Sequence, residues 1–139
     1  MVIKTSDTTI QSDNTVNDDT ELRFAVQAGY RYCGYAMIFV TSGTTPDFKY
    51  NFSVPVGATG YRLDAALSGA AMGTATSITT EKTGIATTGS RQCIFIPFFI
   101  KTASTAGEVI FRWAQNTSTA SNTTVHEGSF IMVDNRDSF

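Results

Sequence analysis

Charged residues are scarce in this chain of 139 residues. Charged residues make up 16% of the sequence, well below the roughly 25% of an average soluble domain, and the net charge is −2. A protein that binds the phosphate backbone of nucleic acids needs clustered Lys and Arg, whereas the 10 basic residues of this chain are scattered. The sequence therefore predicts no nucleic-acid partner, and a polar surface made largely of Thr, Ser, Asn and Gln.

The chain also has only 2 cysteines and 1 histidine. Without a CxxC pair, these residues do not make the ligand set of a structural zinc site. Cys33 and Cys93 each lie in the middle of an apolar segment, so we expect two buried thiols that pack as small hydrophobic residues. A disulfide between them stays open, because the sequence does not fix the distance between the two segments.

Long apolar runs and export signals are missing as well. The sequence has no stretch of about 20 apolar residues, which a membrane-spanning helix needs. Residues 1–9, MVIKTSDTT, lack the charged and then apolar pattern of a signal peptide. We therefore expect a soluble, non-secreted protein that makes no membrane contact.

Common catalytic motifs are absent, and the polar residues that could act as acids or bases have simpler explanations. Asp18–Asp19 predicts a turn; a calcium site is the alternative, but the spacing of an EF-hand is missing. Asp47 and Lys49 predict a charge pair on a solvated face. His126 and Glu127 would point to opposite faces of a strand, so they predict no dyad. We expect no catalytic residue, no cofactor, no metal site and no enzymatic activity.

The chain is rich in alternating aromatic and β-branched residues. Between residues 48 and 54, apolar and polar side chains alternate with the period of a half-buried strand, and Pro46 and Pro55 flank this segment as turn formers. Residues 22–26 and 109–113 alternate in the same way. In contrast, residues 30–41 are apolar on both faces, which predicts a strand that is either covered on both sides or part of a subunit interface.

The most apolar run, residues 93–102, contains Pro97. Because proline lacks the N–H that a ladder needs, this strand must lie at an edge, or bulge or bend there. About eight strands joined by short turns predict an all-β protein, an antiparallel two-sheet β-sandwich of jelly-roll type. An immunoglobulin-like sandwich is the alternative, although Trp113 follows both cysteines. A helix competes with strand and loop only over residues 63–72.

The predicted organisation is an N-terminal arm with short strands over residues 1–19 and a single β-sandwich domain over residues 20–139. Three tyrosines crowd the strand that is apolar on both faces. They either pack within one protomer or line a partner surface, where tyrosine is enriched. The arm offers two apolar anchors of its own. The candidate partner-binding residues are therefore Val2, Ile3, Tyr30, Tyr32 and Tyr35.

Two stretches carry a recognisable pattern of turns and strands: NDDTELRFAVQAGYRY at residues 17–32 and SGTTPDFKYNFSVPVGATGY at residues 42–61. They resemble a module that recurs in virion structural proteins of tailed bacteriophages and in related metagenomic sequences. The resemblance is close over the first half of the chain and only stylistic over the rest. The resemblance therefore indicates a structural component of the phage particle.

The resemblance implies a small, non-enzymatic β-sandwich that is made in the host cytoplasm and ends up in the virion, at the capsid surface. There it would act as a decoration or cement protein whose partner is the major capsid protein. Proteins of this kind are often homo-oligomers, dimers or trimers. The module also occurs in tail fibres, so a tail component that binds host glycan through an exposed Tyr or Trp113 is the alternative. A cellular sandwich-type binding module is a third possibility.

Overall fold

The structure is a computed structural model that describes residues 1–64 and 74–138. Its described elements are all β-strands and form two antiparallel sheets, which confirms the predicted two-sheet β-sandwich. The strands are β1 (Val2–Ile3), β2 (Thr8–Ile10), β3 (Asn17–Val26), β4 (Tyr30–Ser42), β5 (Phe48–Ser53), β6 (Thr59–Asp64), β7 (Thr74–Ser77), β8 (Lys82–Ile85), β9 (Gln92–Lys101), β10 (Gly107–Gln115), β11 (Thr123–Val125) and β12 (Phe130–Ser138). The helix alternative for residues 63–72 falls mainly outside the described residues.

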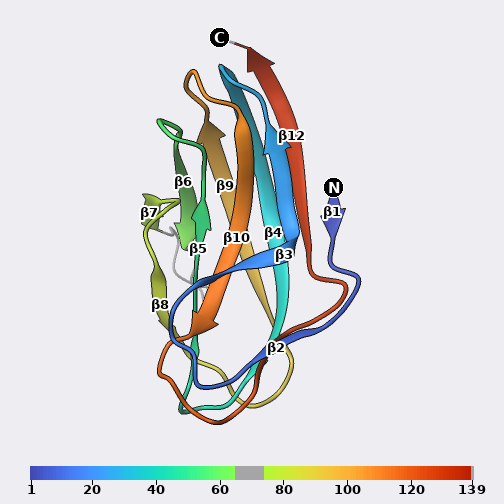
Figure 1. Ribbon diagram of the computed structural model, residues 1–139, viewed down its shortest axis with the longest axis vertical. Helices are drawn as coiled ribbons and strands as arrows, with labels where there is room; N and C mark the ends of the chain where they lie inside the picture. Colours follow the sequence, from blue (N-terminus) through green and yellow to red (C-terminus); the bar gives the residue numbers. More distant parts are fainter. Residues whose placement is uncertain (65–73, 139) are drawn as a thin grey trace.

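The chain crosses between the sheets repeatedly. The large sheet has the order β1-β12-β4-β9-β6-β7, with β11 joining β4 to β2, and the small sheet has the order β3-β10-β5-β8. From β3 to β6, and again from β8 to β12, each long strand is followed by one in the other sheet, as a jelly roll requires. Figure 1 shows the strands running along the long axis, with β2 and the loops before β5 and after β10 gathered at one end.

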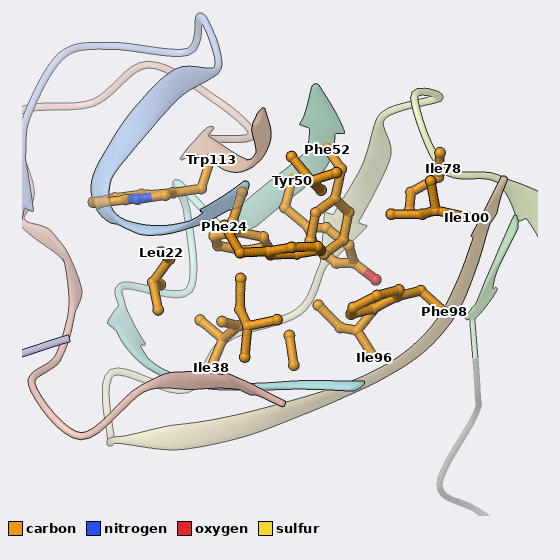
Figure 2. Packing of buried hydrophobic residues seen from close by; sticks show 14 of the residues in the cluster. Leu22, Phe24, Ile38, Tyr50, Phe52, Ile78, Ile96, Phe98, Ile100 and Trp113 are labelled. Carbon is orange, nitrogen blue, oxygen red and sulfur yellow. The ribbon is translucent and has the colours of Figure 1, made fainter. Parts of the chain in front are cut away.

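The core lies between the two sheets and is built from aromatic side chains. Phe48, Tyr50 and Phe52 of β5 are all buried, as the alternation predicted. The Phe52 ring lies 5.7 Å from that of Phe98 in the large sheet and 5.4 Å from that of Phe111 in its own sheet, measured between centroids. Figure 2 shows this cluster filling the space between the sheets.

Pro97 lies where β9 becomes an edge strand. β9 pairs with β4 along its whole length, but its ladder with β6 covers only residues 98–101. Among the described residues, β9 therefore has a neighbour on one side only from Pro97 back to Gln92. This confirms the prediction that the proline marks an edge, because the missing N–H falls just beyond the end of the β6 ladder.

Neither thiol is buried, contrary to the prediction. Cys33 is half-buried and Cys93 is exposed, because both belong to the outward-pointing set of their strands. They are unpaired: Cys33 lies opposite Phe99 and Cys93 opposite Phe39. Six residues of extended chain, about 20 Å, therefore separate their positions along the sheet, far beyond disulfide distance.

The N-terminal arm is fixed to the sandwich. β1 pairs with β12, and β2 pairs with β11. Between them the fully buried Lys4 ammonium lies 3.1 Å from an oxygen of Asp19 and 3.1 Å from one of Glu21. Asp19 also accepts a hydrogen bond from Trp113 Nε1. The arm thus forms the rim of the large sheet.

Asp18–Asp19 is not the separate turn that the sequence predicted, because both residues lie within β3. The register of β3 against β10 shifts there, between the partners of Ile110 and Arg112. At this bulge, Asp19 Oδ1 accepts hydrogen bonds from the N–H groups of Glu21 and Leu22. Asp19 therefore accepts backbone hydrogen bonds as an aspartate in a turn does, but it does so within a bulged strand.

Candidate interaction surface

The two outer faces of the sandwich differ in polarity, and the outer face of the small sheet is the polar one. Its outward side chains form ion pairs that are at least partly exposed, at 2.8–3.2 Å: Arg23 with Glu108, Lys49 with Glu81 and Arg112 with Asp18. Such pairs stay hydrated and contribute little to stability. This face is a solvated surface.

The outer face of the large sheet is apolar. Along β4, the even-numbered side chains such as Ile38 point into the core, and the odd-numbered ones such as Tyr35 point out. The registers of β12 and β9 against β4, of β6 against β9 and of β1 against β12 bring further outward residues into line with these. The apolar outward residues, which we call the outer face, are Ile3, Cys33, Tyr35, Met37, Phe39, Tyr61, Leu63, Cys93, Phe95, Pro97, Phe99, Phe130 and Met132.

Several large side chains of the outer face are well exposed. The exposed fraction is 59% for Tyr61, 46% for Ile3, 39% for Phe95 and 36% for Met132. Apolar side chains that are exposed together on one face make that face a candidate interaction surface.

An aromatic cluster holds the centre of the outer face in place. The Tyr35 ring lies 5.3 Å from the Phe95 ring and 6.0 Å from the Phe130 ring, between centroids. Tilted and edge-on pairs at these distances are favourable and restrict the rings. Because the rings are held by neighbours on three strands, little side-chain freedom remains to be lost when a partner covers them.

A shallow hollow lies to one side of this cluster. Its volume is about 230 Å³, and it is lined by Tyr61, Arg62, Leu63, Ala75, Pro97, Phe98 and Phe99. Its lining is almost wholly apolar, so it suits an apolar side chain of a partner.

The five predicted partner-binding residues divide between the two sides of the large sheet. Ile3 and Tyr35 lie on the outer face. Tyr32 is buried, with its hydroxyl accepting a hydrogen bond from the N–H of Gln27, and Val2 and Tyr30 pack against the core cluster. As partner-binding residues, all five remain predictions.

Sequence reasoning did not single out Tyr61, Phe95, Phe130 and Met132. The available signal was the apolar character of both faces of residues 30–41, together with the runs at 93–102 and 130–133. Trp113, which the sequence offered as a sugar-stacking residue, is only 3% exposed and stacks on Phe48 within the core, so that assignment is wrong.

His126 lies at the edge of the core, as predicted, and forms no dyad with the exposed Glu127. Its Nε2 is 2.8 Å from Thr41 Oγ1, and its Nδ1 is 3.1 Å from Asp7 Oδ2. Thr41, His126 and Asp7 thus follow one another as the hydroxyl, imidazole and carboxylate of a hydrolase triad do. The Arg91 guanidinium, however, lies 3.0 Å from the same Nδ1. Nδ1 can accept a hydrogen bond from Arg91 or donate one to Asp7 but cannot do both, so Asp7 does not fix the tautomer of the ring as the carboxylate of a triad does.

Asp47 and Lys49 do not form the predicted pair, because Asp47 has a φ of 49° and stands outside the alternation of β5. Asp47 accepts a hydrogen bond from the Thr87 N–H instead. Partial desolvation raises the pKa of the Cys93 thiol, which favours its protonated form at neutral pH.

Residues 1–64 and 74–138 contain no cluster of His, Cys, Asp and Glu that could hold a metal ion. The same residues contain no helix long and apolar enough to cross a membrane. Comparisons with protein-family models, with curated proteins and with solved structures find no match.

Proposed function

We propose that this chain is a non-enzymatic structural protein of a tailed-bacteriophage particle, which decorates and stabilises the capsid by binding the lattice of the major capsid protein. The observation that carries the proposal is the apolar outer face on a rigid β-sandwich. A protein of this build works by burying surface against other subunits. The choice of particle rests on the resemblance of residues 17–32 and 42–61 to virion structural modules.

The arrangement of polar and apolar surfaces supports this role. The apolar outer face suits a permanent contact. The Thr-rich loops at the β2 end and the charged face of the small sheet suit hydrated, reversible contacts. The arm is held by the buried Lys4 and contributes mainly Ile3, at the rim. Capsid contacts would therefore come from the body of the sandwich and its loops.

Cryo-electron microscopy of the particle that carries this chain tests the proposal. Density for a two-sheet sandwich that repeats across the icosahedral head is the expected result. If mass spectrometry of the purified particles finds none of this chain, the proposal is wrong.

A tail or fibre component that binds host glycan is the second candidate, and the exposure of Tyr61 favours it. An exposed aromatic ring beside a hollow is a common platform for a sugar ring. In this case, density would be confined to the tail. Binding of the protein to host surface polysaccharide would also be lost in Tyr61→Ala and retained in Tyr35→Ala, a second aromatic change on the same face.

A further inference from the structure

A pocket opens on the flank of the sandwich where β6 and β9 separate. Among the described residues, the ladder between these strands ends at the pair of Arg62 and Phe98, next to Pro97, which has no N–H to extend it. Strands β5 and β8 of the small sheet lie on the same flank as β6 and β7 (Figure 1). The flank pocket, as we call it, has a volume of about 200 Å³ and is lined by Tyr50, Leu63, Asp64, Lys82, Ile85, Ile94 and Phe95.

The walls of the flank pocket are mainly apolar. Leu63, Ile85 and Ile94 supply aliphatic side chains, and all three are only half-buried by the protein itself. The volume is somewhat larger than that of a cavity of about 150 Å³ that holds a benzene molecule. The pocket therefore has room for a body of about five carbon atoms with one small polar group.

Lys82 is the unusual residue of this lining. It lies opposite Tyr50 in the β5–β8 ladder, so the two side chains share the inner side of the small sheet. In the described part of the chain, Lys49 has Glu81 as its ion-pair partner, whereas the Lys82 ammonium has no ion pair or hydrogen bond. A half-buried ammonium without a protein partner is a donor that an anion in the pocket can use.

Tyr50 supplies a second donor. Its hydroxyl lies 3.4 Å from Asp64 Oδ1, which is longer than the roughly 2.5–3.0 Å of an ordinary O–H···O hydrogen bond. Burial raises the pKa of the Tyr50 hydroxyl above its usual range, so the hydroxyl keeps its proton at neutral pH. The Asp64 carboxylate is already compensated by the buried Arg62, whose Nε lies 2.9 Å from Oδ1. The uncompensated charge of the pocket is therefore that of Lys82.

We infer that the flank pocket binds a short apolar carboxylate, which pairs with the Lys82 ammonium and accepts a hydrogen bond from the Tyr50 hydroxyl. Its aliphatic body would lie against Leu63, Ile85 and Ile94. Two carboxylate oxygens match the two donors, and one negative charge matches the one ammonium. A free acid has this chemistry, and so does the apolar C-terminal residue of another protein chain. The inference goes beyond the proposed function and does not rest on it.

Nuclear magnetic resonance titration of the isotope-labelled full chain at neutral pH tests the site. The probe is isovalerate, compared with its neutral counterpart isovaleramide and with acetate, which keeps the charge but lacks the aliphatic body. We expect saturable shifts with isovalerate at the amides of β8 and of residues 92–97. Both other probes should bind at least tenfold more weakly, because the charged contact and the aliphatic body each contribute to affinity.

Two results would overturn the inference. One is the absence of saturable shifts with isovalerate, and the other is equal binding of isovalerate and isovaleramide. In either case, Lys82 would keep only the role of an inward-pointing charge on the edge strand β8, which hinders pairing with another chain.

Variants test the role of the ammonium. Lys82→Met keeps an unbranched side chain without the charge, so it should weaken isovalerate binding at least tenfold and leave isovaleramide binding unchanged. Lys49→Met is the matched control, because Lys49 lies on the outward side of the same sheet and pairs with Glu81. It should leave isovalerate binding unchanged, and an equal loss in both variants would overturn the assignment of Lys82. Circular dichroism shows whether each variant folds, and Lys82→Gln takes the place of an unfolded Lys82→Met.

A peptide distinguishes the two sources of the carboxylate. The probe is a short peptide that ends in leucine with a free carboxylate, and the same peptide with a C-terminal amide is its control. Tighter binding of the free-carboxylate peptide than of isovalerate assigns the site to a chain end, and equal or weaker binding assigns it to a free acid. Both results support the site. Neither depends on where the protein lies in a phage particle, so failure of the proposed function would leave the inference standing.

Discussion

The buried contact between Lys4 and Asp19 offers a sharp test of how the arm is held. The Asp19 carboxylate is fully buried and accepts hydrogen bonds from three neutral N–H groups besides the Lys4 ammonium. Asp19→Ala removes the shared acceptor of the three N–H groups and leaves the Lys4 ammonium with Glu21 alone of its two carboxylate partners. Removing one partner of a buried ion pair costs about 3–5 kcal/mol, so we expect a loss of stability in that range.

The opposite change should be milder. Lys4→Met removes the buried ammonium and fills its volume, while Asp19 keeps its three neutral donors, each worth about 1.5–3 kcal/mol to a charged acceptor. We therefore expect Lys4→Met to cost at least about 2 kcal/mol less than Asp19→Ala. The adjacent Asp18 provides the control, because its pair with Arg112 is exposed and Asp18→Ala should cost under about 1 kcal/mol.

Urea unfolding, followed by far-ultraviolet circular dichroism at one fixed protein concentration, measures all three differences. A fixed concentration keeps any contribution of self-association to the measured stability the same for all variants. The reasoning fails if Asp19→Ala is as mild as Asp18→Ala, or if Lys4→Met is as costly as Asp19→Ala.

Three further predictions concern stability. Phe52→Ala should cost about 3–5 kcal/mol and Pro97→Ala under about 1 kcal/mol in urea melts, because Phe52 is 1% exposed whereas Pro97 lies at the end of a ladder; the reverse order would contradict the strand assignment. Gly34→Ala should destabilise the β4–β12 pairing, since its Cβ would overlap the carbonyl oxygen of Met132, and hydrogen exchange at β12 would reveal it. Hydrogen bonds from the arm, led by a hydroxyl, lower the pKa of Glu21 from 4.5 to about 2. The ionised form is therefore favoured by folding, so the stability that Glu21→Gln removes should be present above pH 4.5 and disappear as the pH falls towards 2; a difference that persists at pH 2 would contradict this.

Much of the sandwich could be predicted because a strand's period of two is visible in the residues themselves. The alternation of residues 48–54 identified the buried ring set of β5, and the lack of an N–H at Pro97 located the end of a ladder. The bulge at Asp19 could not be predicted, because it depends on a lysine 15 residues earlier and on Trp113 across the sheet. Contacts of that separation leave no local pattern.

For a similar reason, the candidate interaction surface could be predicted from the sequence only in part. Alternation shows which side chains share a face, but it does not show which face meets the second sheet. For residues 30–41, both faces are apolar, so Tyr32 and Tyr35 carried the same signal although one is buried and the other lies on the outer face. The strand order was needed to separate them. The exposure of Cys93 follows from the same ambiguity.

The edges of the large sheet bear on how this protein can associate with other chains. An exposed sheet can associate through its edges or through its face, and edge association tends to continue without limit. In the described part of the large sheet, the outermost strands are very short: β1 has 2 residues and β7 has 4. Short edges offer few unpaired N–H and C=O groups to another chain, so they discourage edge-to-edge pairing. The large sheet thus combines blunted edges with an outer face on which Tyr61, Phe95 and Met132 stay exposed in the single chain.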